Sequence, residues 1–245
     1  MPLEAAYLTV PERVEMLNSS YRHHAAIPVL TEALNDPLLG NVALVSSFGA
    51  ESVVLLHMVA TIKPETPVVM IDTEMLFPET LDYQAEVAEK LGLQNMRIIR
   101  ADAAAVAAAD PDGTLHQTAP DACCSLRKTE PLQKALGDYD AWITGRKRFQ
   151  SGQRAVLDLF ESEDDIRIKI NPLAHWRQQD LIAYMENNAL PRHPLVAKGY
   201  PSIGCAPCTT PVGRNEDPRS GRWRGQDKVE CGIHFGADGK IVRGA

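Results

Sequence analysis

Apolar runs that alternate with polar turns and helical stretches are the feature that most constrains the fold of this chain. Residues 42–45 form an apolar run that leads into a polar turn at 46–52, and residues 53–59 are apolar on nearly every side. A second apolar run at 68–71 precedes a helical stretch at 78–91, which begins with proline and is followed by glycine. This alternation predicts βαβ units, in which helices cover buried strands.

The same pattern continues toward the C-terminus. Further strands and helices are expected at 97–99, 142–144 and 166–170 and at 103–109 and 180–187, respectively. The predicted fold class is therefore α/β, with a doubly wound and mostly parallel sheet. Ligands of such sheets bind at the carboxyl ends of the strands, so we expect the polar turns after Val45, Ile71 and Thr144 to converge.

Charge and cysteine count exclude several functional classes. With 25 Lys+Arg against 32 Asp+Glu, the formal charge is −7, which disfavours nucleic acid and anionic membranes as partners. No window approaches the roughly 18 apolar residues of a membrane span. Five cysteines cannot all pair within one chain, and the N-terminus lacks the pattern of a signal peptide. We therefore expect a cytoplasmic protein with reduced thiols.

Composition also suggests how the chain is divided. Its 245 residues are 44% hydrophobic and 23% charged, which is typical of a globular protein with one large domain. Seven of the sixteen glycines lie in residues 213–245. We expect residues 1–212 to form a single α/β domain and residues 213–245 to form a mobile tail.

The first polar turn is a candidate anion site. Ser46, Ser47, Gly49 and Ser52 lie between a buried strand and a buried helix, where backbone N–H groups and hydroxyls could face an anion. An ordinary turn with a serine cap fits the same residues equally well. The turn lacks the Gly-Lys-Ser/Thr ending of a Walker loop, which argues against a triphosphate with Mg²⁺.

Basic residues gather in three places of this acidic chain. They are Arg127-Lys128, then 146–148 with Arg154, then Arg214, Arg219, Arg222 and Arg224. Any one cluster is most simply a solvated surface. Three clusters, each near a glycine turn or a cysteine pair, favour a pocket for a phosphate- or sulfate-bearing ligand, because arginine matches such oxyanions.

The cysteines are the strongest chemical signal. Cys123 and Cys124 are adjacent, and Cys205 and Cys208 form a CxxC pair. Two pairs suit a tetrathiolate site for zinc or an iron–sulfur cluster. The alternative is a thioredoxin-like CxxC accompanied by buried thiols. Cys231 is left over in the glycine-rich tail, where nearby arginines would favour its thiolate and make it a candidate nucleophile.

Taken in order, the motifs resemble those of the phosphoadenylyl- and adenylyl-sulfate reductases, a branch of the adenine-nucleotide α-hydrolase-like fold, which is Rossmann-like. The similar segments are SSFGAES (46–52), IDTEMLFPET (71–80), CCSLRKTEPL (123–132), WITGRKRFQSGQR (142–154), INPLAHW (170–176), LPRHPLVAKGYPSIGCAPCT (190–209) and ECGIH (230–234). The order and spacing of CC, SIGCAPCT and ECGIH are highly specific.

The resemblance implies a thioredoxin-dependent adenylyl-sulfate reductase of assimilatory sulfate reduction and cysteine biosynthesis. Cys123, Cys124, Cys205 and Cys208 would hold a [4Fe-4S] cluster, which in the family usually accompanies adenylyl sulfate rather than its 3′-phosphorylated form. Cys231 would attack the sulfur of adenosine 5′-phosphosulfate, releasing AMP and leaving an S-sulfocysteine. Thioredoxin or glutaredoxin would then release sulfite by thiol exchange.

The resemblance also implies which residues bind the substrate. Lys128 would lie between cluster and sulfate, Arg154 and Arg146 would bind the phosphosulfate, and Arg219 and Arg222 would close over it with the tail. The adenosine would contact Ser46, Ser47, Gly49, Ser52, Asp72 and Thr73. One departure is Glu74, because many relatives carry glycine there.

Other functions remain compatible with the residues. The enzyme could instead use the 3′-phosphorylated substrate or both substrates, since the SSFGA form also occurs among relatives that use it. A metal-bearing redox sensor with Cys231 as its regulatory thiol is a second class. An ATP-pyrophosphatase-type ligase is disfavoured by the single glycine of the first turn. The sequence leaves the oligomeric state open, a homo-oligomer included.

Overall fold

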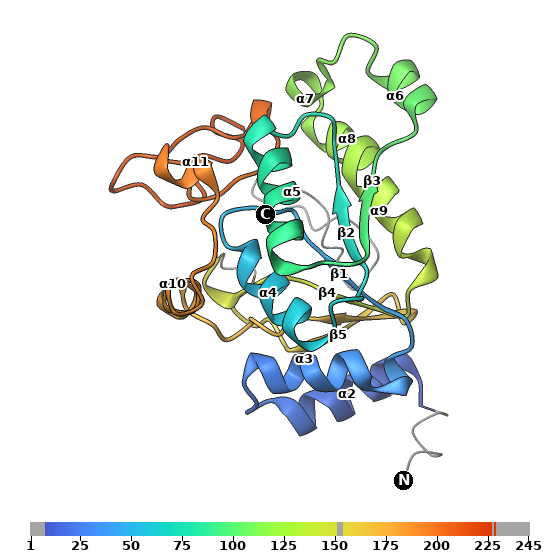
Figure 1. Cartoon of the computed structure of the whole chain (residues 1–245). Coiled ribbons are helices and arrows are strands. Elements are labelled where there is room, and N and C mark those ends of the chain that lie inside the picture. The colour runs from blue at the N-terminus through green and yellow to red at the C-terminus, as the bar shows by residue number, and fades with distance from the viewer. Residues whose placement is uncertain (1–7, 151–153, 227, 229–245) are drawn as a thin grey trace.

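A six-stranded sheet lies at the centre of the fold (Figure 1). The computed structural model describes residues 8–150, 154–226 and 228. The strands run in the order β3-β2-β1-β4-β6-β5, and every neighbouring pair is parallel except β5 and β6. Their bounds are β1 (Val42–Val45), β2 (Val68–Ile71), β3 (Met96–Ile99), β4 (Ala141–Ile143), β5 (Phe160–Glu163) and β6 (Arg167–Ile170). The prediction of a mostly parallel α/β sheet is confirmed.

Alternating side chains of the central strands enter two cores on opposite faces of the sheet. Leu44, Val68 and Met70 belong to a large core that includes α4 (Ser52–Ile62), α5 (Pro78–Leu91) and α10 (Gln178–Asn187). Ala43, Val69 and Trp142 belong to a smaller core with α9 (Glu130–Ala135). Both faces of the sheet are thus covered, which explains why its central strands are continuously apolar.

Helix α5 begins and ends where the sequence predicts. Pro78 occupies its first turn, where a missing N–H costs nothing, and Gly92 follows its last residue with a φ of 64°. That left-handed conformation is easiest for glycine, and it lets the Gly92 N–H bond back to the last helical carbonyls. Proline and glycine therefore define the length of this helix.

Two N-terminal helices lie below the sheet in Figure 1: α2 (Val10–Tyr21) packs against β5, and α3 (Ala26–Asn35) packs against α4. The side chain of Asn18 donates to the Phe160 carbonyl at 2.8 Å and accepts from the Phe160 N–H at 3.0 Å. These bonds satisfy backbone groups that an edge strand otherwise leaves open. Within the described ranges, no helix is long and apolar enough to cross a membrane.

The remaining elements are short. They are η1 (Pro37–Leu39), α6 (Ala103–Ala109), α7 (Leu115–Thr118), α8 (Pro120–Cys124), the π-helical turn η2 (Ser125–Thr129), η3 (Leu136–Asp138), η4 (Arg148–Gln150), α11 (Pro194–Ala197) and η6 (Ala206–Cys208). The described part of the region beyond residue 212 folds back on η6. The Thr210 N–H donates to the Gly221 carbonyl at 2.8 Å, and the Trp223 N–H donates to the Cys208 carbonyl at 3.0 Å.

Candidate active site

A pocket of about 400 Å³ opens at the carboxyl ends of β1 and β4. Its walls come from the turn after β1, from the segment after β4, and from two later segments at 201–204 and 217–223. Nine residues that the sequence predicts to bind a ligand line it. They are Ser46, Ser47, Gly49, Ser52, Lys128, Arg146, Arg154, Arg219 and Arg222. The pocket therefore lies where the topology of a doubly wound sheet places a ligand.

Two serines of the first turn accept hydrogen bonds from backbone N–H groups of the same turn. Ser46 Oγ accepts from the Phe48 N–H at 3.2 Å, and Ser52 Oγ accepts from the Gly49 N–H at 3.0 Å. Phe48 has a φ of 49° and a side chain that is completely buried. The buried ring and the two serine bonds fix the turn, so the ordinary structural role accounts for two of the hydroxyls. Ser47 and Gly49 also line the pocket.

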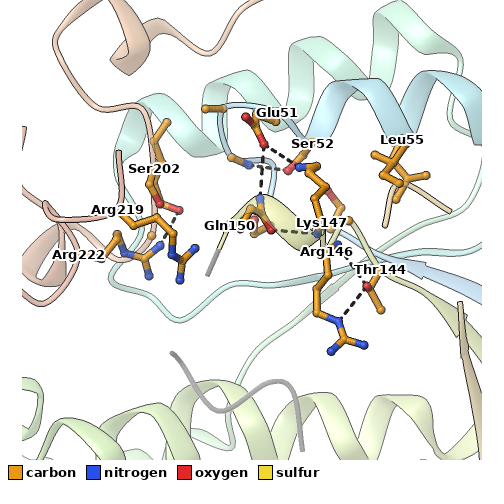
Figure 2. Close-up of a pocket in the computed structure, with 18 of the residues that line it drawn as sticks. Glu51, Ser52, Leu55, Thr144, Arg146, Lys147, Gln150, Ser202, Arg219 and Arg222 are labelled. Atoms are coloured by element: carbon orange, nitrogen blue, oxygen red, sulfur yellow. Dashed lines mark hydrogen bonds and ion pairs between the residues drawn. The ribbon is translucent and has the colours of Figure 1, made fainter. Parts of the chain in front are cut away.

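One wall carries an ion pair that the sequence analysis missed. Lys147 Nζ lies 2.7 Å from Glu51 Oε2, and the Gln150 amide reaches the same oxygen at 3.5 Å (Figure 2). The side chain of Lys147 is only 5% exposed. Burial lowers the pKa of Lys147, while the carboxylate of Glu51 opposes that shift. This wall thus contains a buried ammonium group, Lys147, whose charged form is stabilised by the carboxylate of Glu51.

Two predicted arginines of this wall already have partners within the protein. Arg146 pairs with Glu161, and it donates to Asn171 Oδ1 at 3.2 Å. Arg154 donates to the Gln150 side chain. Both arginines still line the pocket, so an anion there would compete with these acceptors or bind beside them.

The opposite wall presents Arg219 and Arg222, which face the first wall across the pocket (Figure 2). Arg222 Nη1 donates to the Ile203 carbonyl at 3.2 Å, and its Cζ lies 4.4 Å from the centre of the Trp223 ring. The aromatic face stabilises the guanidinium. This wall therefore concentrates fixed positive charge, as binding of an oxyanion requires.

A second, smaller cavity of about 20 Å³ is lined by Cys123, Cys124, Cys205 and Cys208. None of the four thiols forms a disulfide. Helix α8 carries the first pair, and the loop of the second pair is held against the segment after β2, because the Ala206 N–H donates to the Met75 carbonyl at 2.7 Å. The fold thus brings together two pairs that are far apart in sequence, and the four thiols could hold a metal group.

Burial dominates the electrostatics of this cavity. It raises the pKa of Cys123 to about 11, and neighbouring thiols contribute to that shift while Arg127 opposes it. Burial likewise raises the pKa of Cys208, and Arg222 and Lys128 oppose that shift. Forming thiolates here therefore requires the nearby cations or a bound metal.

Three side chains line both the pocket and the thiol cavity: Lys128, Arg222 and Trp223. The indole of Trp223 is buried at 3% exposure, and its backbone has a φ of 50°. An anion in the pocket and a metal group between the thiols would thus share one wall, which is cationic.

Comparison with known proteins identifies the family of the chain. The phosphoadenosine phosphosulfate reductase domain matches residues 41–211. An adenosine 5′-phosphosulfate reductase from Mesorhizobium japonicum is 49% identical over 219 residues, which are 89% of this chain and 86% of that protein. The chain belongs to the phosphoadenosine phosphosulfate reductase family.

Other members of the reductase family differ in the substrate that their names give. A phosphoadenosine 5′-phosphosulfate reductase from Gloeobacter violaceus is 40% identical over 195 residues, 78% of this chain and 81% of that protein. A crystal structure of the phosphoadenylyl-sulfate reductase of Candida auris, with phosphate, superposes with a TM-score of 0.71 at 29% identity, covering 81% of this chain and 97% of that one. The shared fold is the adenine-nucleotide α-hydrolase-like fold expected from the motifs.

Two predicted ligand residues of this reductase lie outside the larger pocket. Asp72 accepts from Arg100 Nε at 2.8 Å and from the Glu74 N–H at 2.9 Å. Thr73 lines the thiol cavity instead, where its Oγ1 lies 3.2 Å from Cys205 Sγ. Glu74 has a φ of 60°, the conformation for which glycine is better suited. The predicted nucleophile, Cys231, lies outside the described residues.

Arg127, one of the basic residues that led us to expect an anion pocket, lines the thiol cavity and not the larger pocket. Arg127 Nη2 lies 2.9 Å from Asp110 Oδ2, and Arg127 Nη1 donates to the Thr73 carbonyl at 3.3 Å. Asp110 also accepts from the Leu115 N–H at 2.9 Å, and this bond is the main cause that lowers the pKa of Asp110. The two adjacent basic residues, Arg127 and Lys128, are the sequence signal for this part of the site. Arg127 points into the protein, whereas Lys128 lines the pocket.

Proposed function

We propose that this chain is an assimilatory adenylyl-sulfate reductase, which converts adenosine 5′-phosphosulfate to sulfite and AMP. The observation that carries the proposal is the cationic wall of Lys128 and Arg222, common to the anion pocket and the thiol cavity. Its relatives that bear the name adenosine 5′-phosphosulfate reductase support this choice of substrate.

In this mechanism, the pocket binds and neutralises the phosphosulfate. The guanidinium groups of Arg219 and Arg222 and the ammonium of Lys128 surround the sulfate with positive charge, which lowers its repulsion of an incoming thiolate. The adenosine lies along the turn after β1, beside Ser47 and Gly49. The charges on the wall also stabilise the AMP leaving group.

Cys231 supplies the nucleophile in this proposal. Its Sγ thiolate attacks the sulfur of the sulfate group, a sulfur–sulfur bond forms, and the sulfur–oxygen bond to phosphate breaks with its electron pair on AMP. A thiolate of thioredoxin or glutaredoxin then attacks Cys231 Sγ and displaces sulfite. The second thiol of that partner releases Cys231, so that two thiols are oxidised to a disulfide and sulfate sulfur is reduced by two electrons.

The four thiols of the cavity fit a [4Fe-4S] cluster. They line one space together, with one pair on α8 and the other on the CxxC loop. Two pairs of thiolates around one space match the four cysteine ligands that such a cluster takes. When bound, the cluster would supply a fixed charge and a cross-link between α8 and η6.

The remaining expectations from the sequence fit the proposal. Free thiols suit the reducing cytoplasm, where thioredoxin is available. We assign residues 1–212 to the nucleotide-binding domain and residues 213–245 to a tail that carries Cys231. Part of that tail, 221–223, packs on the CxxC loop.

A sulfite assay with anaerobically purified protein tests the proposal. Adenosine 5′-phosphosulfate with thioredoxin should yield sulfite and AMP in equal amounts. Absence of sulfite would exclude the function, and higher kcat/KM with the 3′-phosphorylated nucleotide would favour the activity named for the Gloeobacter relative. Zinc without iron or sulfide would instead favour a redox sensor.

Two cysteine variants separate the two proposed thiol roles. Cys231→Ser should keep the visible absorbance and nucleotide binding but release no sulfite, and full turnover would contradict its role as nucleophile. Cys208→Ser should lose iron, sulfide and visible absorbance. An unchanged spectrum would remove Cys208 from the ligand set.

A further inference from the structure

Gly204 lies where the CxxC loop meets the larger pocket. It precedes Cys205 and lines the pocket together with Arg222. A methyl group built on its Cα would lie 2.3 Å from Arg222 Nη2 and 2.4 Å from Arg222 Cζ. Real carbon atoms do not approach that closely, so any side chain at this position would displace the guanidinium.

The backbone of Gly204 gives no other reason for glycine. Its φ lies outside the left-handed range that other residues avoid, unlike that of Gly199 at 88°. The three nearest atoms to the added methyl group all belong to the Arg222 side chain. Lack of a side chain at Gly204 therefore matters because of Arg222.

Other glycines of the same pocket have room for a methyl group. The nearest atom to one built on Gly49 is Ser47 Oγ at 3.5 Å, and the nearest to one on Gly145 is a Leu55 methyl at 3.9 Å. Both distances are ordinary van der Waals contacts. Among the glycines of this pocket, Gly204 is the one at which a methyl group would strike a basic side chain.

Because Gly204 has no side chain, the Arg222 guanidinium can make two contacts. The guanidinium reaches the Ile203 carbonyl at 3.2 Å and lies 4.4 Å from the Trp223 ring centre, and the backbone of residue 222 pairs with Thr209. These contacts fix the charged group at the wall between the pocket and the thiol cavity, facing the pocket in Figure 2. Preorganised charge of this kind binds an anion without the cost of ordering a flexible side chain.

We propose that Gly204 is a positioning residue, which seats the Arg222 guanidinium at the sulfate end of the nucleotide. This inference rests on the proposed function for the identity of the anion. Gly204 acts only through Arg222, so its substitution and that of Arg222 should not have independent effects on binding.

A double-mutant cycle tests this coupling with ADP as the probe, because its β-phosphate stands in place of sulfate and no turnover is needed. Calorimetry would measure the Kd of ADP for the wild type, Gly204→Ala, Arg222→Ala and the double variant. We expect each single substitution to raise Kd about tenfold, as loss of one charge-assisted hydrogen bond does. The double variant should differ from Arg222→Ala by less than about twofold.

Gly137→Ala is the matched control, because a methyl group there has nothing within 4 Å and the residue lies outside the pocket. Arg222→Gln, which lacks Cζ and both Nη atoms, gives a second background should Arg222→Ala not fold. In turnover, Gly204→Ala should raise the KM for adenosine 5′-phosphosulfate more than it lowers kcat, with iron content unchanged.

Three outcomes would overturn the inference. The first is an unchanged Kd of ADP in Gly204→Ala, and the second is a Gly204→Ala substitution that raises this Kd as much in Arg222→Ala as in the wild type. The third is loss of iron from Gly204→Ala. The last would mean that the substitution moves the cysteine loop. Failure of the proposed function can be told apart from failure of this inference. If the wild type made no sulfite from adenosine 5′-phosphosulfate, the Kd values of ADP in the four proteins could still be measured and compared.

Discussion

Replacing Glu51 by glutamine should destabilise the protein through Lys147. The ammonium of Lys147 lies 2.7 Å from Glu51 Oε2, and its side chain is 5% exposed against 24% for Glu51. Glutamine keeps the shape and an accepting oxygen but removes the negative charge. Lys147 would then be a buried cation that has lost its carboxylate partner, and leaving one charge of a buried ion pair without its partner is strongly destabilising.

The size of the effect follows from that geometry. At 2.7 Å, with an effective dielectric constant of about 20, the attraction is about 6 kcal/mol before desolvation is counted. Breaking a fully buried pair costs about 3–5 kcal/mol. Because Glu51 is partly exposed and glutamine still accepts a hydrogen bond, we expect the free energy of unfolding to fall by about 2–3 kcal/mol at pH 7.

The loss should shrink as pH rises. Burial lowers the pKa of Lys147 and Glu51 opposes that shift, so Glu51→Gln lowers this pKa further. Above the lowered pKa, the unfolded variant binds more protons than the folded variant, and its stability therefore rises with pH toward the ordinary pKa of lysine. Neutral Lys147 no longer needs the carboxylate.

Urea unfolding at pH 7 and at pH 10, followed by circular dichroism, would measure both effects. Gln150→Ala is the control for uncharged contacts, because it removes the longer contact to the same Glu51 oxygen, and the acceptor of Arg154 and of the Lys147 N–H, without removing charge. Glu51→Gln with Lys147→Met should recover stability, since both charges are then absent. A variant as stable as the wild type at pH 7, or a deficit that stays constant up to pH 10, would refute the reasoning.

Two further predictions concern the stability of other parts of the fold. Gly221→Ala should separate the tail from the CxxC loop, because its methyl group would lie 2.1 Å from the Thr210 carbonyl oxygen. Limited proteolysis should then cut within 213–226 faster than in the wild type. Equal cleavage rates would contradict this prediction. Burial lowers the pKa of His193 from 6.5 to about 4, and its Nδ1 accepts from the Leu195 N–H, so the folded state holds it neutral. The free energy of unfolding should therefore fall as pH drops from about 6.5 to 4. His193→Asn should weaken this pH dependence, as measured by urea unfolding at several pH values. An unchanged pH dependence in the variant would exclude His193 as its source.

The elements that the sequence predicts best are those with local signals. The bounds of β1, β2 and α5 match the predictions residue by residue, because continuous apolar runs and a proline–glycine pair define them. Strand β5 was missed, since Phe-Glu-Ser-Glu has no apolar alternation. Its Glu163 is buried because Trp142 Nε1 donates to it at 2.8 Å and Lys169 pairs with it at 3.1 Å.

The same distinction holds for the site. Residues of the first turn could be placed because a strand leads directly into them. Asp72 pairs with Arg100, which belongs to the loop after another strand, and its contact with the nucleotide stays a prediction. Roles of Glu51 and Gly204 depend on Lys147 and Arg222, which are distant in sequence, so no local pattern could reveal them.

In the proposed function, the wall formed by Lys128, Arg222 and Trp223 links nucleotide binding thermodynamically to the chemistry of the four thiols. Any change at the four thiols that moves this wall alters the affinity of the pocket, and reciprocity requires an occupied pocket to alter the thiols by the same free energy. Nucleotide at saturating concentration should therefore change how readily oxidants or chelators attack the cysteines. Sensitivity to oxygen would then depend on how much substrate is present.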